Sequence, residues 1–289
     1  MVIGFKRKVA IGLRSELFYP ESHEIGSERF AVVCCAMSTL ICKPRNNGMT
    51  RKVFAFFSTQ ALFLATAFAL SGTAHAQGMK SPYPTMAPLA QYLMTDQNAE
   101  IALARSAAPS SVSRDAEVMV LKQHGYETVE KGKNGFVCLV DRSWMSPFDS
   151  PEFWNPKNRS PTCFNPASVR SVLPFELKRT EWVLAGLSKT QIIARLREAV
   201  EHKEMPALEP GAMCYMMSKD MYLGDAQRHW HPHLMFYSPK SDGADWGANL
   251  DGSPVSLDPI SLSKNSPDPF ITFMVKVWTW SDGTAAPIS

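Results

Sequence analysis

The sequence lacks the short motifs that identify many enzymes. It contains no GxSxG nucleophile elbow, no HExxH zinc-binding helix, no GxxxxGK phosphate loop and no GxGxxG dinucleotide turn. It also shows no internal repeat. The usual sequence arguments for a serine hydrolase, a zinc protease, a nucleotide-binding enzyme or a repeat protein are therefore missing. The first positive signal concerns export instead.

Charge is absent from residues 53–70, which are mostly Phe, Leu and Ala. A basic pair precedes this run, and the small-x-small sequence Ala74-His75-Ala76 follows it. We therefore expect residues 49–76 to be a secretory signal peptide that is cleaved after Ala76. No cysteine follows the run, which argues against a lipoprotein. The alternative is an uncleaved membrane anchor, but polar residues inside the run and the clean cleavage site argue against it.

Forty-eight residues precede this signal, although signal peptides normally begin at the first residue. We expect residues 1–48 to be a non-native upstream extension, with translation starting at Met49, or else a disordered segment. An unusually long basic region ahead of the signal is the alternative. Residues 77–289 then form the mature protein, which is long enough for a single domain with a sizeable core.

The mature part carries little net charge. The whole chain has 30 Lys and Arg and 27 Asp and Glu, but nine of the basic and four of the acidic residues lie in residues 1–76. The remaining 21 basic and 23 acidic residues give residues 77–289 a net charge of −2. No basic patch is left to bind a nucleic acid, and we expect no stable membrane span after signal cleavage.

Cysteine is scarce in the mature part, which holds Cys138, Cys163 and Cys214. Three cysteines exclude a disulfide-rich scaffold, but an exported protein meets an oxidising compartment in which one disulfide can persist. Cys163 lies in the proline-flanked segment SPTCFNP, and we predict a disulfide from it to Cys138, with Cys214 as the second choice of partner. Three buried free thiols are the alternative.

Alternating apolar patterns and helical periodicity predict an α+β fold. The strand-like segments favour an antiparallel sheet of about five to six strands, of which the first three form a meander around the Asn134-Gly135 turn. These segments are residues 116–140, 212–237 and 269–280. Two or three helices are expected to pack on the sheet. The helical patterns lie near residues 96–106, 175–186 and 189–202.

Five prolines alternate with five aromatic residues between positions 142 and 168. Such a segment suits neither a long helix nor a central strand, because proline lacks a backbone N–H. We expect a long ordered proline-aromatic loop that wraps the core, since its aromatic side chains bury well. Long ordered loops often form binding sites. Candidate ligand-binding residues are therefore Trp144 and Trp154 in this loop and Trp230 beyond it; a loop packed for stability alone is the alternative.

The stretch QRHWHPHLMFY, residues 227–237, places a histidine at every second position of a strand-like run. Residues two apart on a strand lie about 6.6–7 Å apart on one face, and residues four apart about 13 Å, so two neighbouring histidines but not all three can share one ion. We predict as candidate ligands of a divalent transition metal His229, His231 and His233. The candidate third ligands are Asp225, His124 and Cys214. A structural role, or ligand contact without a metal, is the alternative.

These observations favour an exported α+β protein, periplasmic or extracellular, that binds a small ligand or a partner. The alternative is a metalloprotein that uses the histidine strand. It would be a zinc or iron hydrolase, or a copper protein in which nearby methionines join the histidines. The sequence does not decide whether the protein is an enzyme, nor what its ligand is.

Overall fold

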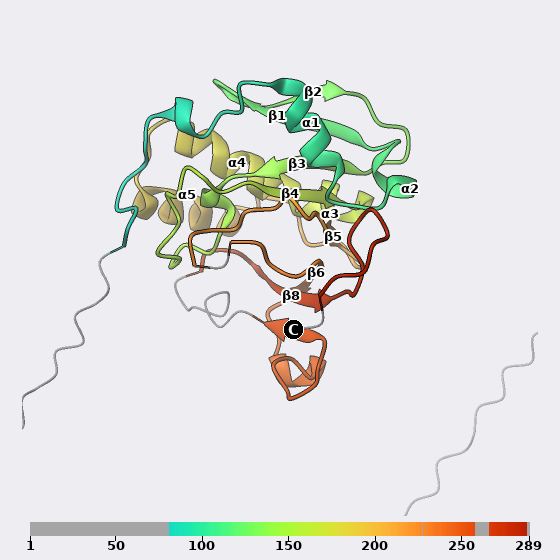
Figure 1. Cartoon of the computed structure of the whole chain (residues 1–289). Coiled ribbons are helices and arrows are strands. Elements are labelled where there is room, and N and C mark those ends of the chain that lie inside the picture. The colour runs from blue at the N-terminus through green and yellow to red at the C-terminus, as the bar shows by residue number, and fades with distance from the viewer. Residues whose placement is uncertain (1–80, 227, 258–265, 288–289) are drawn as a thin grey trace, which may run out of the picture. The chain divides into compact units, whose positions relative to one another are not determined.

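The computed structural model describes residues 81–226, 228–257 and 266–287 (Figure 1). The predicted upstream extension and signal peptide, residues 1–48 and 49–76, lie outside these ranges. Within the described ranges, no helix combines the length and the apolar character that a membrane crossing requires.

The strands of the described residues form one mixed sheet of eight strands in the order β2-β1-β3-β4-β5-β6-β8-β7. Their bounds are β1 Glu117–Lys122, β2 Gly125–Glu130, β3 Val137–Asp141, β4 Ser160–Phe164, β5 Met213–Met216, β6 His233–Pro239, β7 Val255–Leu257 and β8 Phe270–Lys276. The predicted α+β class is confirmed, but five to six antiparallel strands were too few. The sequence pattern misses β4, which contains a proline, and β7, which has only three residues.

The first three strands do not form the predicted antiparallel meander. β1 and β2 are an antiparallel hairpin, but β3 lies on the other side of β1 and pairs with it in parallel. After β2 the chain passes the start of β1 so closely that a Cβ atom on Gly132 would lie 2.2 Å from the backbone nitrogen of Glu117. Gly135 then turns the chain into β3 with a φ of +78°, a conformation that glycine adopts easily.

β4 is a central strand inside the proline-aromatic segment, which the sequence predicted to contain none. It pairs with β5 from Cys163 onward, and Arg159 just before it bridges Tyr222. Pro161 lies two residues from both Arg159 and Cys163, so its backbone nitrogen points to the same side as theirs. On that side, the gap between the Arg159–Tyr222 bridge and the Cys163–Tyr215 pair lies opposite Pro161. No partner strand needs the missing N–H there. The part of the segment before β4 is an ordered loop, as predicted, with a short 3-10 helix η2, Ser143–Met145.

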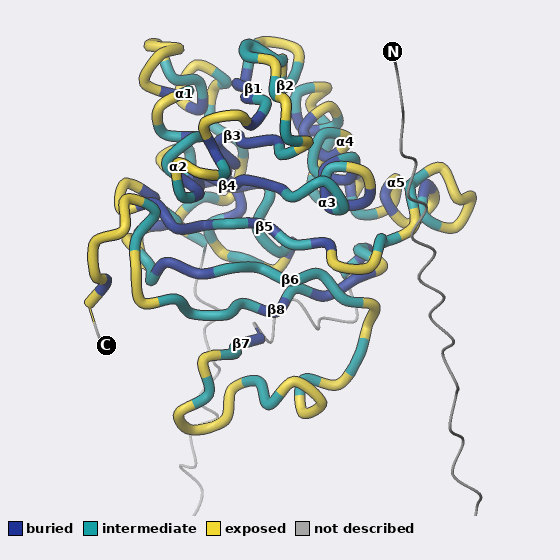
Figure 2. The backbone as a smooth tube through the Cα atoms, turned by 90° about the vertical axis from the view of Figure 1, so that its right-hand side faces the viewer, coloured by how far each residue is buried: buried dark blue, intermediate teal, exposed yellow. Residues whose placement is uncertain are grey.

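Helices cover both faces of the first half of the sheet (Figure 2). On one side lie α1 Gln97–Arg105 and α2 Ser110–Ser113; on the other lie α3 Pro166–Ser171, α4 Leu173–Leu184 and α5 Lys189–Glu201. Two further 3-10 helices are η1 Leu89–Gln91 and η3 Gly243–Trp246. The three predicted helices correspond to α1, α4 and α5. Side chains at the first turn set where α1 and α5 begin. Asp96 caps α1, and Ser188 and Gln191 form the capping box of α5.

Strand β3 supplies side chains to both layers of core. Leu139 packs in the cluster on the α4 side, whereas Cys138 and Val140 pack in the cluster under α1. By this alternation Asp141, the last residue of β3, points to the α4 side. Cys138 is also bonded to Cys163 of β4, the predicted disulfide, and Cys214 of β5 is a buried free thiol.

Candidate functional site

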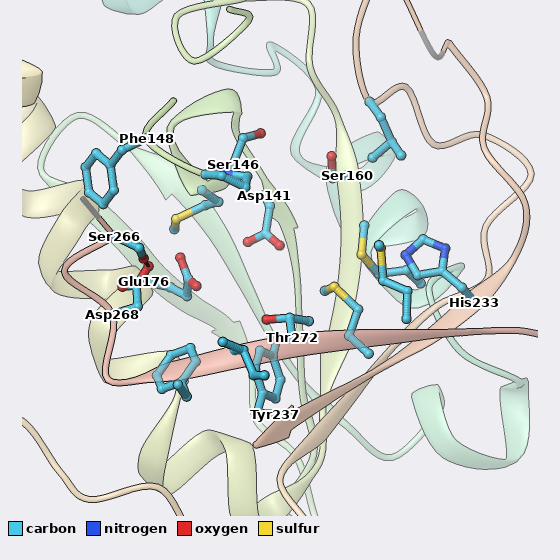
Figure 3. A pocket seen from close by; sticks show the side chains of 18 of the residues that line it. Asp141, Ser146, Phe148, Ser160, Glu176, His233, Tyr237, Ser266, Asp268 and Thr272 are labelled. Carbon is cyan, nitrogen blue, oxygen red and sulfur yellow. Dashed lines mark hydrogen bonds between the residues drawn. The ribbon is translucent and has the colours of Figure 1, made fainter. Parts of the chain in front are cut away.

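A cavity of about 550 Å³ lies on the α4 side of the sheet (Figure 3). Alternate residues of a strand point to the same face, so the strand register brings one row of side chains from each strand to the cavity. These side chains include Asp141 of β3, Met216 of β5, Met235 and Tyr237 of β6, and Thr272 and Met274 of β8. Met235 pairs with Met274, and Tyr237 with Thr272, which makes β6 and β8 a continuous floor.

The loop after β3 and helix α4 cover this floor. Phe148 comes from the loop, Glu176 and Arg179 come from α4, and Asp268 precedes β8. Apolar atoms make up most of the surface of the wall, although about half of the lining residues are polar or charged. An apolar cavity of about 300–1,000 Å³ with a few polar groups is typical of a site for a small organic molecule.

Asp141 brings a carboxyl group into this apolar surrounding. The residue is 8 % exposed, its Oδ2 accepts a hydrogen bond from Thr162 Oγ1 at 2.6 Å, and its Oδ1 has no partner. Burial raises the pKa of Asp141 to about 7, although the Thr162 hydrogen bond and the charges of Arg142 and Arg179 lower it. The carboxyl is therefore partly protonated near neutral pH.

Glu176 supplies a second carboxyl from the first turn of α4. The residue borders the cavity and is half-buried, but its Oε2 has no access to solvent and no partner. Burial raises the pKa of Glu176 to about 8; Arg179 lowers it, and Asp141 and Asp268 raise it further. Figure 3 shows both the Glu176 and the Asp141 carboxyl groups directed into the cavity.

Unpartnered polar atoms concentrate at this cavity. Among the described residues, five buried side-chain oxygen or nitrogen atoms have no hydrogen-bond partner: Asp141 Oδ1, Ser143 Oγ, Glu176 Oε2, Arg179 Nε and Ser241 Oγ. Three of the five belong to residues that line the cavity. Each such group costs about 1–3 kcal/mol while it stays unpartnered, so their clustering points to a place where another molecule supplies the partners.

Two buried arginines lie beside the carboxyls, and each already has an acidic partner. Arg142 is fully buried and donates from Nη2 to Glu100 Oε1 at 2.8 Å and from Nε to a backbone carbonyl at 2.7 Å. Arg179 donates from Nη2 to both carboxylate oxygens of Asp268, at 3.0 and 3.2 Å. Asp141 and Glu176 are therefore left without a cation of their own.

His233 lines the other end of the cavity. It is 3 % exposed, and its Nδ1 lies 2.8 Å from the carbonyl oxygen of His231. Because a carbonyl only accepts, Nδ1 carries the proton and Nε2 is left as an acceptor. Burial lowers the pKa of His233 to about 4, so the ring is neutral at pH 7.

Of the three tryptophans predicted as ligand contacts, Trp230 is the one that lines the cavity. Trp144 is fully buried, and its indole N–H donates to Thr180 Oγ1 at 3.1 Å. Trp154 packs edge-on against Phe153, with ring centroids 4.7 Å apart. The proline-aromatic loop thus reaches the cavity through residues 145–149, which include Phe148, while its tryptophans pack in the core.

The structure places His229 and His233 of the predicted metal site in different surroundings. β6 begins at His233, so His229 and His231 lie ahead of the strand. His233 faces the cavity, whereas the ring of His229 packs edge-on against the ring of Tyr222, with centroids 6.4 Å apart. The even spacing of a straight strand does not extend over all three positions.

The predicted third ligand, Asp225, is engaged elsewhere. Its carboxylate accepts hydrogen bonds from the hydroxyls of Tyr83 and Tyr222 and from Lys157 Nζ, the last at 3.0 Å. In the ranges that the structure describes, no group of three or more His, Cys, Asp or Glu side chains is placed to hold a metal ion. The metal site stays a prediction from the sequence.

Asp141 and Glu176 were not singled out from the sequence. Asp141 follows five apolar residues, FVCLV, where a strand usually gives way to a polar turn. Glu176 lies in the first turn of a helix, where acidic residues are common because they favour the positive end of the helix dipole. A carboxyl directly after a fully apolar strand was the only signal, and it pointed to Asp141 alone.

The chemistry of the site is that of two poorly ionised carboxyls and a neutral imidazole within an apolar wall. Such groups bind and orient polar atoms of a ligand, and carboxyls with raised pKa values also exchange protons near neutral pH. Comparison of the chain with protein-family models, with curated proteins and with solved structures finds no match.

Proposed function

We propose that this protein is exported and binds a small organic molecule in the cavity between α4 and strands β6 and β8. The observation that carries the proposal is the combination of a 550 Å³ apolar space with three buried, unpartnered polar atoms on its lining residues. Apolar walls supply affinity and a few fixed polar groups supply orientation. A bound ligand removes the cost of the unpartnered atoms.

Support for export comes from the signal-like residues 49–76 and from the Cys138–Cys163 disulfide. Disulfides persist in the periplasm and outside the cell but are rare in the reducing cytosol. A binding protein in such a compartment meets molecules taken up from the surroundings or released by the cell.

Binding of the neutral dye Nile red tests the cavity directly. We expect the wild-type mature protein to bind one dye molecule with a rise in fluorescence. Met274→Trp fills the cavity from β8 and should weaken binding at least about tenfold, which corresponds to about 1.4 kcal/mol. The matched control is Val275→Trp, since Val275 lies next in the same strand and points to the other face.

The proposal requires that Met274→Trp binds the dye more weakly than Val275→Trp does. If the wild-type protein does not bind the dye, or if both variants bind it equally well, the cavity is not a ligand site. Circular dichroism of each variant confirms that the fold is retained before binding is compared.

A further inference from the structure

We propose that the ligand is an organic cation, with an apolar body in the cavity and a protonated amine placed between Asp141 and Glu176. This inference rests on the proposed function and names its ligand class. It follows from the charges around the cavity, the direction of the two carboxyl groups and the chemistry of the wall.

The charges that surround the cavity do not balance. The cavity is lined by four carboxyl groups, on Asp141, Asp149, Glu176 and Asp268, and by two guanidinium groups, on Arg142 and Arg179. The charge of Lys189 offsets that of Asp149. Each arginine is bound to one carboxylate, Arg142 to Glu100 and Arg179 to Asp268. Two carboxyls remain without a counter-charge, and one ammonium group offers both the missing charge and several N–H donors.

Two further cations lie nearby, and other groups engage them. Arg159 donates to the backbone carbonyl oxygens of Pro156, Asn158 and Gln91. At the rim, Lys189 donates to the carbonyl oxygen of Phe148 at 2.7 Å, and the charge of Asp149 acts on it. The other groups that face the two carboxyls are Tyr126, His233, Cys214 and Tyr237. Burial raises the pKa of the two tyrosines and of Cys214, and it lowers the pKa of His233, so all four are neutral at pH 7.

The geometry of the carboxyls suits a donor rather than an anion. Asp141 is more than nine-tenths buried, and Oδ1 of Asp141 and Oε2 of Glu176 are acceptors without a donor. Figure 3 shows both carboxyl groups pointing into the same space. A carboxylate or phosphate ligand would add negative charge beside these two carboxyls. The Nη2 groups of Arg142 and Arg179 are already bound to Glu100 and Asp268, and one N–H, on Arg179 Nε, is left for an acceptor.

The wall around the carboxyls is suited to the apolar body of such a cation. Aromatic faces and thioethers contact alkyl groups attached to a charged nitrogen favourably. The cavity wall already contains one contact between a cation and an aromatic face: the guanidinium carbon of Arg179 lies 4.4 Å from the ring centroid of Phe148. Trp230, Met235 and Phe270 line the rest of the space.

Binding of a cation is coupled to loss of protons. With pKa values of about 7 and about 8, the two carboxyls hold protons in the empty cavity at neutral pH. An ammonium group favours their ionised forms, so binding releases about one proton at pH 7. The affinity then rises with pH by up to about tenfold per pH unit per released proton, until both carboxyls are ionised in the empty protein.

Isothermal titration calorimetry with two matched probes tests this inference. The probes are 4-phenylbutylamine, a cation, and 4-phenylbutan-1-ol, which is neutral and has the same carbon frame. At pH 8 we expect the wild-type protein to bind the amine at least about tenfold more tightly than the alcohol, as charged hydrogen bonds imply. Titrations at pH 7 in phosphate and in Tris, which differ in ionisation enthalpy, should report release of about one proton per amine and none for the alcohol.

Isosteric variants connect the preference to the two carboxyls. Asp141→Asn and Glu176→Gln keep the side-chain shape and should each reduce the preference for the amine to about threefold or less. Asp115→Asn removes an exposed carboxyl far from the cavity lining and should keep the full preference. The proton count in the wild-type protein needs no variant, so it remains decisive even if one of them folds poorly.

Three results would overturn the inference: equal affinity for the two probes, no proton release with the amine, or a preference that survives in both isosteric variants. If the alcohol and Nile red bind but the amine has no advantage, the cavity is a ligand site for neutral molecules. If neither probe binds and Nile red also fails, the proposed function falls together with the ligand class.

Discussion

Individual buried residues make the stability of this protein depend on pH. Asp141 and Glu176 have pKa values of about 7 and about 8 in the folded state, above those of unfolded carboxyls. The folded state therefore keeps protons that the unfolded state has lost. The stabilising contribution is complete below about pH 4 and is lost as the pH rises through about 7 and about 8. His233 acts in the opposite direction, but only between about pH 4 and 6.5.

Between about pH 6.5 and 8 the carboxyls act alone among these three groups. We expect the free energy of unfolding of the wild-type protein to fall over this interval by up to about 1.4 kcal/mol per pH unit for each proton involved. Urea unfolding at half-unit steps of pH measures the slope. Glu176→Gln should reduce it, and Asp115→Asn should not. Wild-type stability that stays level or rises from pH 6.5 to 8 would contradict the assignment.

Individual site residues could be predicted from the sequence only in part. Trp230 lines the cavity, whereas Trp144 and Trp154 lie in the core; ligand contact by Trp230 stays a prediction. Asp141 and Glu176 lie 35 positions apart in the sequence. The chain gives a signal for Asp141 alone, as a carboxyl directly after a fully apolar strand. The two carboxyls reach the same cavity because α4 packs against η2, which closely follows β3.

At the scale of elements, the disulfide between β3 and β4 sets the register on which the site depends. Cys138 pairs with Cys163, and Thr162 beside it donates to Asp141 at the end of β3. We expect the double variant Cys138→Ala/Cys163→Ala to lose about 3 kcal/mol of unfolding free energy, as the closure of a loop of this length implies. Urea unfolding measures the loss.

Reduction serves as the control for this prediction. A reducing agent should lower the stability of the wild-type protein to about that of the double variant, and should leave the double variant unchanged. Cys214 is a buried free thiol in both proteins and cancels in the comparison. Equal stability of the oxidised wild-type protein and the double variant would show that the crosslink does not contribute.

Local signals predicted helices better than strands. The starts of α1 and α5 follow from side chains that cap their own backbone, so a few consecutive residues suffice. The strand order does not follow from such signals. β3 pairs in parallel with β1, and Pro161 is accepted within β4 because the neighbouring strand leaves a gap beside it.

At the scale of the whole molecule, the proposed export predicts which form of the chain is found in the cell. If residues 49–76 are a signal peptide, the protein recovered from the periplasm or the medium begins at Gln77 and contains the Cys138–Cys163 bond. Intact-mass measurement before and after thiol alkylation checks both features in one sample. Full-length protein with reduced thiols in the cytosol would contradict the prediction.

The sequence by itself determined the α+β class, the three main helices and the choice of cysteine pair, because periodicity, capping and segment composition are properties of neighbouring residues. Only the tertiary structure decided the eight-strand order, the different surroundings of His229 and His233, and the cavity with its two carboxyls. The physical reason is that a pKa and an unpartnered oxygen depend on what surrounds a group in space. For Asp141 and Glu176, those surroundings come from α4, β4, β6 and the segment before β8, which are distant from one another along the chain.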